Sequence, residues 1–302
     1  MMDAKKKKFF IGSLSAITCE ILYGLSYIFT KQATSTASEF ALLGWRFLLA
    51  TLVMNFCILI GLIKIDLTGK SLKPLILVAL FSPVLYFIGE TIGINHTTAS
   101  ESGVFLACIP VASLIASAII LKKPPTKLQT AGILFTLIGV LVTVISVGAS
   151  SSLSLSGYSF LFLAILSYAL YSVFVEKASN YSGAEITFMM LSAGALIFVS
   201  LALLEAIFQG EITALLTLPL TNHHFLLAIL YQAIGCSVVA FFLTNVAIAN
   251  IGVNRTSSYI GVATVVSILA GSIFLEEYFS YYQAIGVFLI ITGVYIANTN
   301  SH

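Results

Sequence analysis

Hydrophobic residues along this chain gather into long runs that are separated by short polar breaks. The runs cover residues 10–30, 40–63, 74–95, 101–121, 128–147, 157–178, 184–208, 224–249, 255–275 and 280–298. About 20 apolar residues suffice to cross a bilayer as a helix, and a helix satisfies its own backbone hydrogen bonds in lipid. The pattern therefore predicts an all-α membrane protein with ten transmembrane helices.

Composition supports this class and excludes others. Of 302 residues, 59% are hydrophobic and only 9% are charged, and the mean hydropathy is +1.06. A soluble domain carries many more charges, and the net charge of +2 does not indicate a nucleic-acid partner. The four cysteines are widely spaced within apolar runs, without the spacing of a metal site or a disulfide framework. No cofactor or metal is predicted.

Lysine placement predicts the orientation. With a cytoplasmic amino terminus, the inside segments would hold Lys5, Lys6, Lys7, Lys8, Lys64, Lys70, Lys73, Lys122, Lys123, Lys127 and Lys177. The outside loops would hold only Lys31. Because cytoplasmic loops carry the excess of lysine and arginine, we expect a multi-pass protein of the cell (plasma) membrane with both termini in the cytoplasm.

The chain also repeats itself at the scale of half its length. Residues 23–33 align with 168–178, and Leu121, Gln129, Gly132 and Gly139 align with Leu275, Gln283, Gly286 and Gly293. We therefore expect a first five-helix repeat over 1–149 and a second over 150–302. Five is an odd number, so the second repeat would be inserted upside down. Inverted repeats are typical of transporters whose substrate site lies between the halves.

Several short motifs resemble the EamA-type transporters of the drug/metabolite transporter superfamily. In the second half they lie at residues 245–249, 275–277, 283–286 and 293–294; in the first half they lie at 109–111, 129–132 and 139–140. Lys122 and Thr264 depart from the family pattern at positions that we interpret as structural. The resemblance implies a ten-helix exporter or exchanger of amino acids or related metabolites. It also implies a central cavity lined by helices other than the fifth and tenth.

Polar residues inside the runs are the candidates for a substrate site, because a charge at the bilayer centre costs about 3 kcal/mol on insertion scales. Glu20 shares one helix face with Tyr23 and Tyr27. Glu20 is either a cavity carboxylate that takes up a proton during transport or a neutral packing group. Arg46 and Glu90 are either an ion pair or a pair that binds a zwitterionic substrate, since the planar arginine fork suits a carboxylate.

The remaining candidates extend this set into both halves. Tyr86 shares the face of Glu90, Tyr168 and Tyr171 are the repeat mates of the first tyrosine stripe, and Asn245 and Tyr259 lie in the eighth and ninth runs. The predicted substrate-binding set is Glu20, Tyr23, Tyr27, Arg46, Tyr86, Glu90, Tyr168, Tyr171, Asn245 and Tyr259.

The residue inventory separates the remaining function classes. An intramembrane histidine cluster or a nucleophile with a positioned base is not visible, and the only aspartates, Asp3 and Asp66, lie outside the runs. We therefore expect no enzymatic activity, and the lack of a P-loop or a filter motif argues against a pump or a channel.

The interpretation that is left is a secondary transporter that exports or exchanges small neutral or zwitterionic metabolites such as amino acids. Its partners would be that substrate, the lipid bilayer and, if Glu20 is coupled, protons. A drug or other metabolite efflux carrier and a non-transporting scaffold or sensor are the alternatives. The fifth and tenth runs can contact either lipid or a second subunit, so a homodimer is one of two allowed arrangements.

Overall fold

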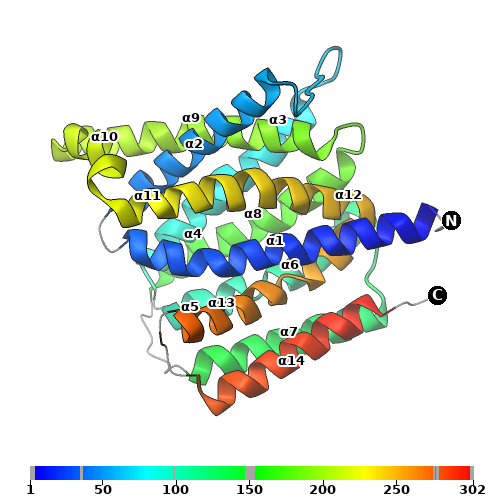
Figure 1. Cartoon of the computed structure of the whole chain (residues 1–302). Coiled ribbons are helices and arrows are strands. Elements are labelled where there is room, and N and C mark those ends of the chain that lie inside the picture. Colours follow the sequence, from blue (N-terminus) through cyan, green and yellow to red (C-terminus); the bar gives the residue numbers. More distant parts are fainter. Residues whose placement is uncertain are drawn as a thin grey trace.

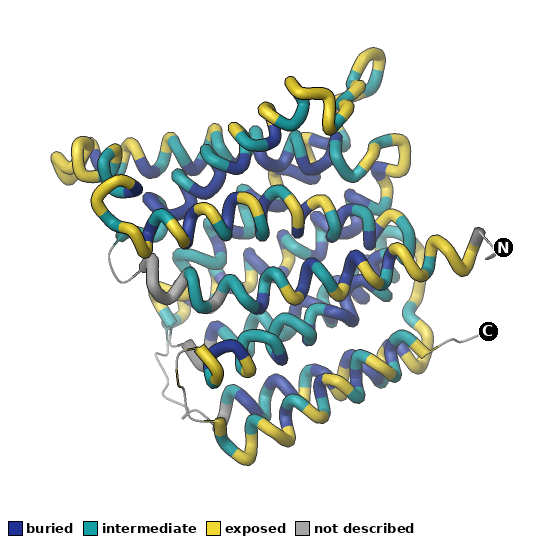
Figure 2. The backbone as a smooth tube through the Cα atoms, viewed as in Figure 1, coloured by how far each residue is buried: buried dark blue, intermediate teal, exposed yellow. Residues whose placement is uncertain are grey.

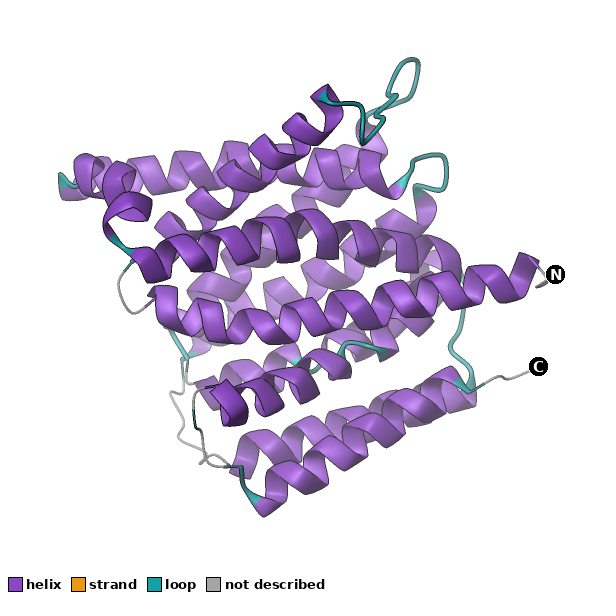
Figure 3. Ribbon diagram, in the orientation of Figure 1, coloured by secondary structure: helices purple, strands orange, loops and turns teal. Residues whose placement is uncertain are grey.

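The computed structural model describes residues 4–34, 37–97, 99–146, 154–274, 276 and 279–299. This described part is built from helices, without a strand (Figure 3). The elements are α1 (Ala4–Thr34), α2 (Glu39–Leu59), α3 (Lys73–Ala79), η1 (Leu80–Leu85), α4 (Tyr86–Asn95), α5 (Ala99–Leu106), α6 (Ile109–Ala116), η2 (Ser117–Leu121), α7 (Lys127–Ser146), α8 (Leu155–Lys177), α9 (Gly183–Gln209), α10 (Ile212–Thr221), α11 (His223–Leu230), η3 (Tyr231–Ala240), α12 (Phe241–Ser258), α13 (Gly261–Phe274) and α14 (Tyr281–Asn298). The three η elements are π-helical.

Nine segments of the described residues are long and apolar enough to cross a membrane. One of them, His223–Ser258, is broken at Gly252, where φ is +77° and ψ is 168°. Val253–Ser258 therefore forms a separate short helix, which α13 follows after a break at Tyr259 and Ile260. Together they complete the ninth crossing. With this division the described residues make ten crossings, as predicted. The short helix α10 occupies a stretch that the hydrophobic pattern left between two runs.

The crossings run back and forth between two faces, and both termini leave the same side of the bundle (Figure 1). We call this side the terminal face and the other side the opposite face. The first repeat begins with α1 at the terminal face, whereas the second begins with α8 at the opposite face. The predicted inverted arrangement is therefore confirmed. The expected boundary between residues 149 and 150 lies outside the described residues.

Repeat mates contact each other where α7 crosses α14. A Cβ on Gly132 would lie 2.5 Å from the carbonyl oxygen of Gly293, and one on Gly139 would lie 2.7 Å from that of Gly286. Small residues allow helix backbones to approach this closely in a membrane. Gly132 aligns with Gly286 and Gly139 with Gly293, and each glycine contacts the repeat mate of the other. This exchange is what a local two-fold relation between the halves produces.

The ends of the repeated helices match as well. The α7 and α14 helices both begin with a capping box, Thr126 with Gln129 and Ser280 with Gln283. Lys122 and Glu276 both adopt a left-handed backbone, with φ of 55° and 53°. These two residues occupy aligned positions, so the difference in residue type at Lys122 leaves the backbone path unchanged.

Helices of one repeat pack mainly on helices of the other. The α1 helix of the first repeat packs along α12 and α13 of the second, and α8 of the second packs along α4 and α6 of the first. We call these the α1 group and the α8 group. The α2 helix packs along α9, and α7 packs along α14. Buried residues are concentrated in the helices at the middle of the bundle, whereas exposed residues are frequent along the outer helices and at helix ends (Figure 2).

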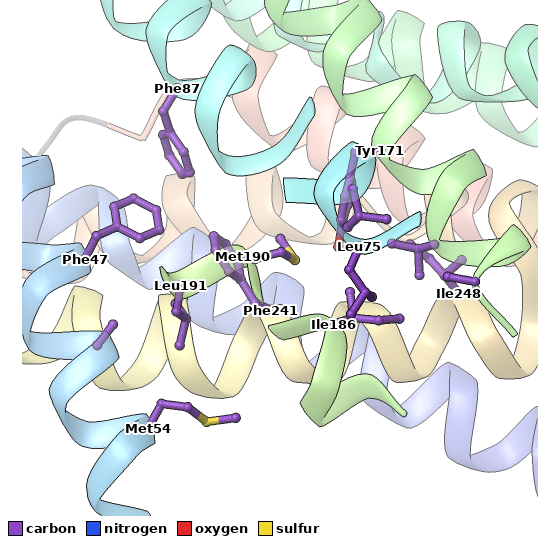
Figure 4. Packing of buried hydrophobic residues seen from close by; sticks show 14 of the residues in the cluster. Phe47, Met54, Leu75, Phe87, Tyr171, Ile186, Met190, Leu191, Phe241 and Ile248 are labelled. Carbon is purple, nitrogen blue, oxygen red and sulfur yellow. The ribbon is translucent and has the colours of Figure 1, made fainter. Parts of the chain in front are cut away.

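The largest apolar core cluster joins the two repeats around Phe47 of α2. Its ring stacks on Phe198 of α9 at a centroid distance of 5.2 Å and meets the edge of Phe87 at 5.7 Å. Phe241, Met190 and Tyr171 belong to the same cluster (Figure 4). This core forms one wall of the space between the α1 and α8 groups.

Candidate functional site

A cavity of about 630 Å³ lies between the α1 group and the α8 group. Its lining reaches from Glu20 and Tyr171 in the middle of the bundle to Glu39, Asn95 and Gly103, which lie at the opposite face. The described lining residues include none from the helix ends at the terminal face. The cavity is therefore directed toward the opposite face and closed toward the terminal face.

The helices around the cavity are interrupted in corresponding places. The third and eighth crossings, which are repeat mates, both contain a π-helical segment, η1 and η3. The fourth crossing breaks at Ala107 and Cys108, and the ninth breaks at Tyr259 and Ile260. Ala107 and Ile260 both line the cavity. Interrupted helices in matching positions of inverted repeats are typical of transporter substrate sites.

Glu20 and Tyr23 of α1, which share one face of the first predicted helix, both line the cavity. The Glu20 side chain is only 4% exposed, and the Cys19 thiol lies 3.9 Å from its Oε1. Within the described residues, no lysine or arginine lies at ion-pair distance from Glu20. The Tyr23 hydroxyl lies 3.5 Å from Thr244 Oγ1. Glu20 is thus a buried carboxyl group at the inner end of the cavity.

Arg46 reaches the cavity from α2 and is held by neutral groups. Its Nε donates to Ser237 Oγ at 2.7 Å, and its Nη1 donates to Gln232 Oε1 at 3.4 Å. The guanidinium also lies over the ring of Phe87, 4.9 Å from the centroid. Both acceptors come from η3, so a helix of the second repeat positions the cation of the first.

Glu90 lies in the same cavity and accepts a hydrogen bond from the Tyr86 hydroxyl at 2.7 Å. In the described part of the chain, no ion pair joins Glu90 to Arg46. The ion-pair alternative for these two residues is therefore not realised in this conformation. A substrate contact for them stays a prediction.

The second-repeat tyrosines form an aromatic wall opposite α1. Tyr168 and Tyr171 both line the cavity, with their ring centroids 5.5 Å apart, and Tyr168 also meets the ring of Tyr86 at 5.7 Å. The Tyr171 hydroxyl donates to Asn245 Oδ1 at 2.7 Å, and Asn245 Nδ2 donates to Thr187 Oγ1 at 3.0 Å. Asn245 is fully buried and lies behind Tyr171 rather than in the lining.

One further candidate, Tyr259, does not belong to the described lining. Tyr259 is buried against Ala16 and Ala247, away from the cavity. Tyr27 belongs to α1, but its side chain lies outside the described residues. Their contact with a substrate stays a prediction.

The structure adds residues that line the cavity or support its lining and that the sequence reasoning did not select. Ser237 and Phe87 hold Arg46, and Val140 and Val144 of α7 also face the cavity. The last two differ from the expectation that the fifth helix stays away from the cavity, because α7 passes beside the break in the fourth crossing. A neutral serine, a phenylalanine and two valines carry no signal that separates them from ordinary packing residues.

Comparisons with known proteins agree with this architecture. The model of the EamA-like transporter family matches residues 10–145 and 155–299. One relative, "Uncharacterized transporter YcxC" from Bacillus subtilis (strain 168), is 30% identical over 289 residues, which cover 95% of this chain and 92% of that protein. Another, "Uncharacterized transporter YyaM" from the same organism, is 28% identical and covers 92% and 90% of the two chains.

More distant relatives extend the same pattern. An "Uncharacterized transporter" from Archaeoglobus fulgidus is 25% identical over 295 residues, covering 96% of this chain and 97% of that one. A solved crystal structure superposes with a TM-score of 0.79 over 95% of this chain and 96% of that one, at 18% identity. At this identity the superposition shows the fold alone. With a family match in each half, the chain belongs to the EamA-like transporter family and is a multi-pass membrane transporter by its relatives.

Proposed function

We propose that this protein is a secondary transporter that exports or exchanges small neutral or zwitterionic metabolites, such as amino acids, by alternating access around the central cavity. We also propose that it acts in the cell membrane with its terminal face in the cytoplasm. The described cavity would then be open to the outside. Lysine placement along the chain supports this orientation.

The observation that carries the proposal is the set of charges in the cavity between the repeats. Arg46 and Glu20 are buried and Glu90 is partly buried; all three line the cavity and lack an oppositely charged partner at ion-pair distance in the described structure. Charged groups inside a membrane bundle mark substrate or ion pathways. A substrate carboxylate would bind the guanidinium of Arg46, and a substrate ammonium would face a carboxylate.

The cavity also limits the charge of the substrate. Arg46 is the one lysine or arginine among the described lining residues, and the surrounding wall is largely apolar and aromatic. A multiply anionic solute would require several cations, because each buried anion needs its own partner. A solute of low net charge with an apolar part fits this wall better.

The test is uptake of a metabolite panel into proteoliposomes that contain the purified protein. We expect at least one zwitterionic amino acid to be transported, and Arg46→Gln to reduce that flux by about a hundredfold, since losing one partner of a buried charge pair costs 2–5 kcal/mol. Arg46→Lys should retain more of the flux because it keeps the charge. Lys64→Gln, which removes an exposed lysine, should match the wild type.

Other results would select the alternatives. If the protein carries lipophilic drugs and no zwitterion, and Arg46→Gln has no effect, the drug-efflux alternative replaces the proposal. The apolar share of the cavity wall is the feature that favours that second candidate. If no solute in the panel crosses the membrane, a scaffold or sensor role is the better explanation.

A further inference from the structure

Three helix ends meet at the terminal face, directly beyond the closed end of the cavity. The carboxylate of Glu176, near the end of α8, accepts a hydrogen bond from the Val253 backbone N–H at 2.7 Å. Its other oxygen binds Lys123 Nζ, which follows η2, at 2.5 Å. Asn254 Nδ2 donates to the backbone carbonyl of Lys123 at 3.1 Å.

These contacts connect the two helix groups that flank the cavity. Lys123 and Glu176 belong to the α8 group, whereas Val253 and Asn254 lie at the turn between the eighth and ninth crossings in the α1 group. The other ion pair of the described residues, Lys70 with Glu185, is different. It joins the α2–α3 connection to α9, and neither this connection nor α9 belongs to the α1 group or the α8 group. That pair does not cross the gap between the two groups.

The break at Gly252 explains why a carboxylate is needed here. The left-handed backbone of Gly252 ends one helix and begins another, so the N–H groups of the next residues have no carbonyl in a preceding turn. Glu176 Oε2 meets the first of them, at Val253. A Cβ on residue 252 would lie 3.3 Å from the same oxygen. The glycine thus provides both the reversal of the chain and the space for the Glu176 carboxylate.

Glu176 and Lys123 differ in solvent exposure, and this difference indicates a separate role for each. The Glu176 side chain is 12% exposed, whereas that of Lys123 is 64% exposed. An exposed ion pair contributes little stability by itself. Lys123 can, however, hold the carboxylate in the orientation in which it meets Val253, and its own carbonyl receives Asn254.

We propose that Glu176 is the gate residue that keeps the terminal end of the cavity closed, with Lys123 as its positioning residue. The gate opens when the Glu176 carboxylate leaves Val253 and Asn254 leaves the Lys123 carbonyl, so that the two helix groups separate at this face. Water at the membrane surface then replaces the lost hydrogen bonds. This inference rests on the proposed alternating-access cycle and names the contact that must break in each cycle.

The experiment measures access to the cavity from each face and needs no substrate. Thr264, a partly exposed lining residue of α13, is replaced by cysteine in a protein whose Cys19, Cys57, Cys108 and Cys236 have been changed to alanine or serine. A membrane-impermeant thiol reagent is applied to vesicles that expose either the terminal or the opposite face. Labelling rates are then compared for Glu176→Ala, Glu176→Gln and Lys123→Gln, with Lys64→Gln as the control that removes an exposed lysine elsewhere on the same face.

We expect Glu176→Ala to raise terminal-face labelling by about tenfold and to lower opposite-face labelling, as a lost hydrogen bond to a charged group would do. Glu176→Gln and Lys123→Gln should show smaller shifts in the same directions, because both keep an acceptor near Val253. Lys64→Gln should change neither rate. If Glu176→Ala does not fold, the two glutamine variants alone decide the test.

Two results would overturn the gate. One is unchanged terminal-face labelling in every Glu176 and Lys123 variant. The other is an equal rise from both faces, which would mean a loosened bundle. Because labelling is independent of flux, a chain that gates but carries nothing from the panel contradicts only the proposed function. A chain that transports normally without any labelling shift contradicts only the gate.

Discussion

The α7–α14 pair and the central cavity are both built from helices of the two repeats, but they differ in how closely the helices pack and in how polar their residues are. Where α7 meets α14, the helices are uninterrupted, and glycines bring the two backbones into direct contact. Around the cavity, four crossings contain π-helical segments or breaks, and Glu20, Arg46 and Glu90 are buried or partly buried without an oppositely charged partner at ion-pair distance in the described structure. The difference indicates that the first region maintains the fold, whereas the second is packed less closely and holds the charged groups of the proposed substrate site.

The largest effect on stability is expected from filling the close contact between α7 and α14. In Gly132→Val, the new Cβ would lie 2.5 Å from a backbone carbonyl of Gly293, which cannot move without shifting the helix. Overpacking of this kind costs about 1–3 kcal/mol or more. We expect a lower melting temperature and less monodisperse protein in detergent. Ile138→Ala, on the exposed side of the same helix, is the control and should leave both nearly unchanged.

If Gly132→Val were as stable as the wild type, the close contact between α7 and α14 would not be what maintains the fold. The comparison between the two regions would then lose its basis.

A smaller loss of stability is expected at the support behind the cavity wall. Asn245→Ala leaves the Tyr171 hydroxyl and Thr187 without their shared partner. An unsatisfied buried polar group costs about 1–3 kcal/mol. We expect a moderate decrease in thermal stability together with a severalfold loss of transport, because Tyr171 is no longer fixed against the cavity. Thermal unfolding and flux are measured on the same preparation.

A variant that removes only the Tyr171 hydroxyl, Tyr171→Phe, separates the two contributions. It should retain more stability than Asn245→Ala, because the asparagine keeps its bond to Thr187. A stability loss confined to Tyr171→Phe would contradict the role of Asn245 as a support.

The smallest effect on stability is expected inside the cavity itself. Glu20→Gln preserves the shape of a side chain that has no basic partner at ion-pair distance in the described structure, so folding should be nearly unaffected. Under the proton-coupling hypothesis, the variant still carries substrate but loses the dependence of flux on pH, because glutamine cannot exchange a proton. The measurement is uptake into proteoliposomes across a series of pH values.

A wild-type rate with unchanged pH dependence in Glu20→Gln would rule out proton coupling at this residue. Transport along a neutral path lined by the tyrosines would then be the better mechanism.

Much of the fold could be predicted because lipid imposes few choices on a chain. Helices are required where backbone groups cannot reach water, so apolar run lengths alone indicate the crossings. The aligned glycines of the fifth and tenth runs, together with the odd number of crossings in each half, also predicted the inverted repeat. The sequence could likewise select Glu20, Tyr23, Arg46, Tyr86, Glu90, Tyr168 and Tyr171, since a polar group in a membrane run is costly unless it faces protein or water.

Only the tertiary structure decided which of these residues share one cavity and which support it. Asn245 and Glu20 are both polar residues within apolar runs, yet one lies behind Tyr171 and the other on the cavity wall. The contact of Glu176 with Val253 depends on the chain reversal at Gly252 and on residues 77 positions apart. Hydrophobic periodicity indicates which residues of a helix face away from lipid, because each helix contacts the bilayer independently of the other helices. It does not report which distant polar groups meet, because that depends on how the two repeats pack together.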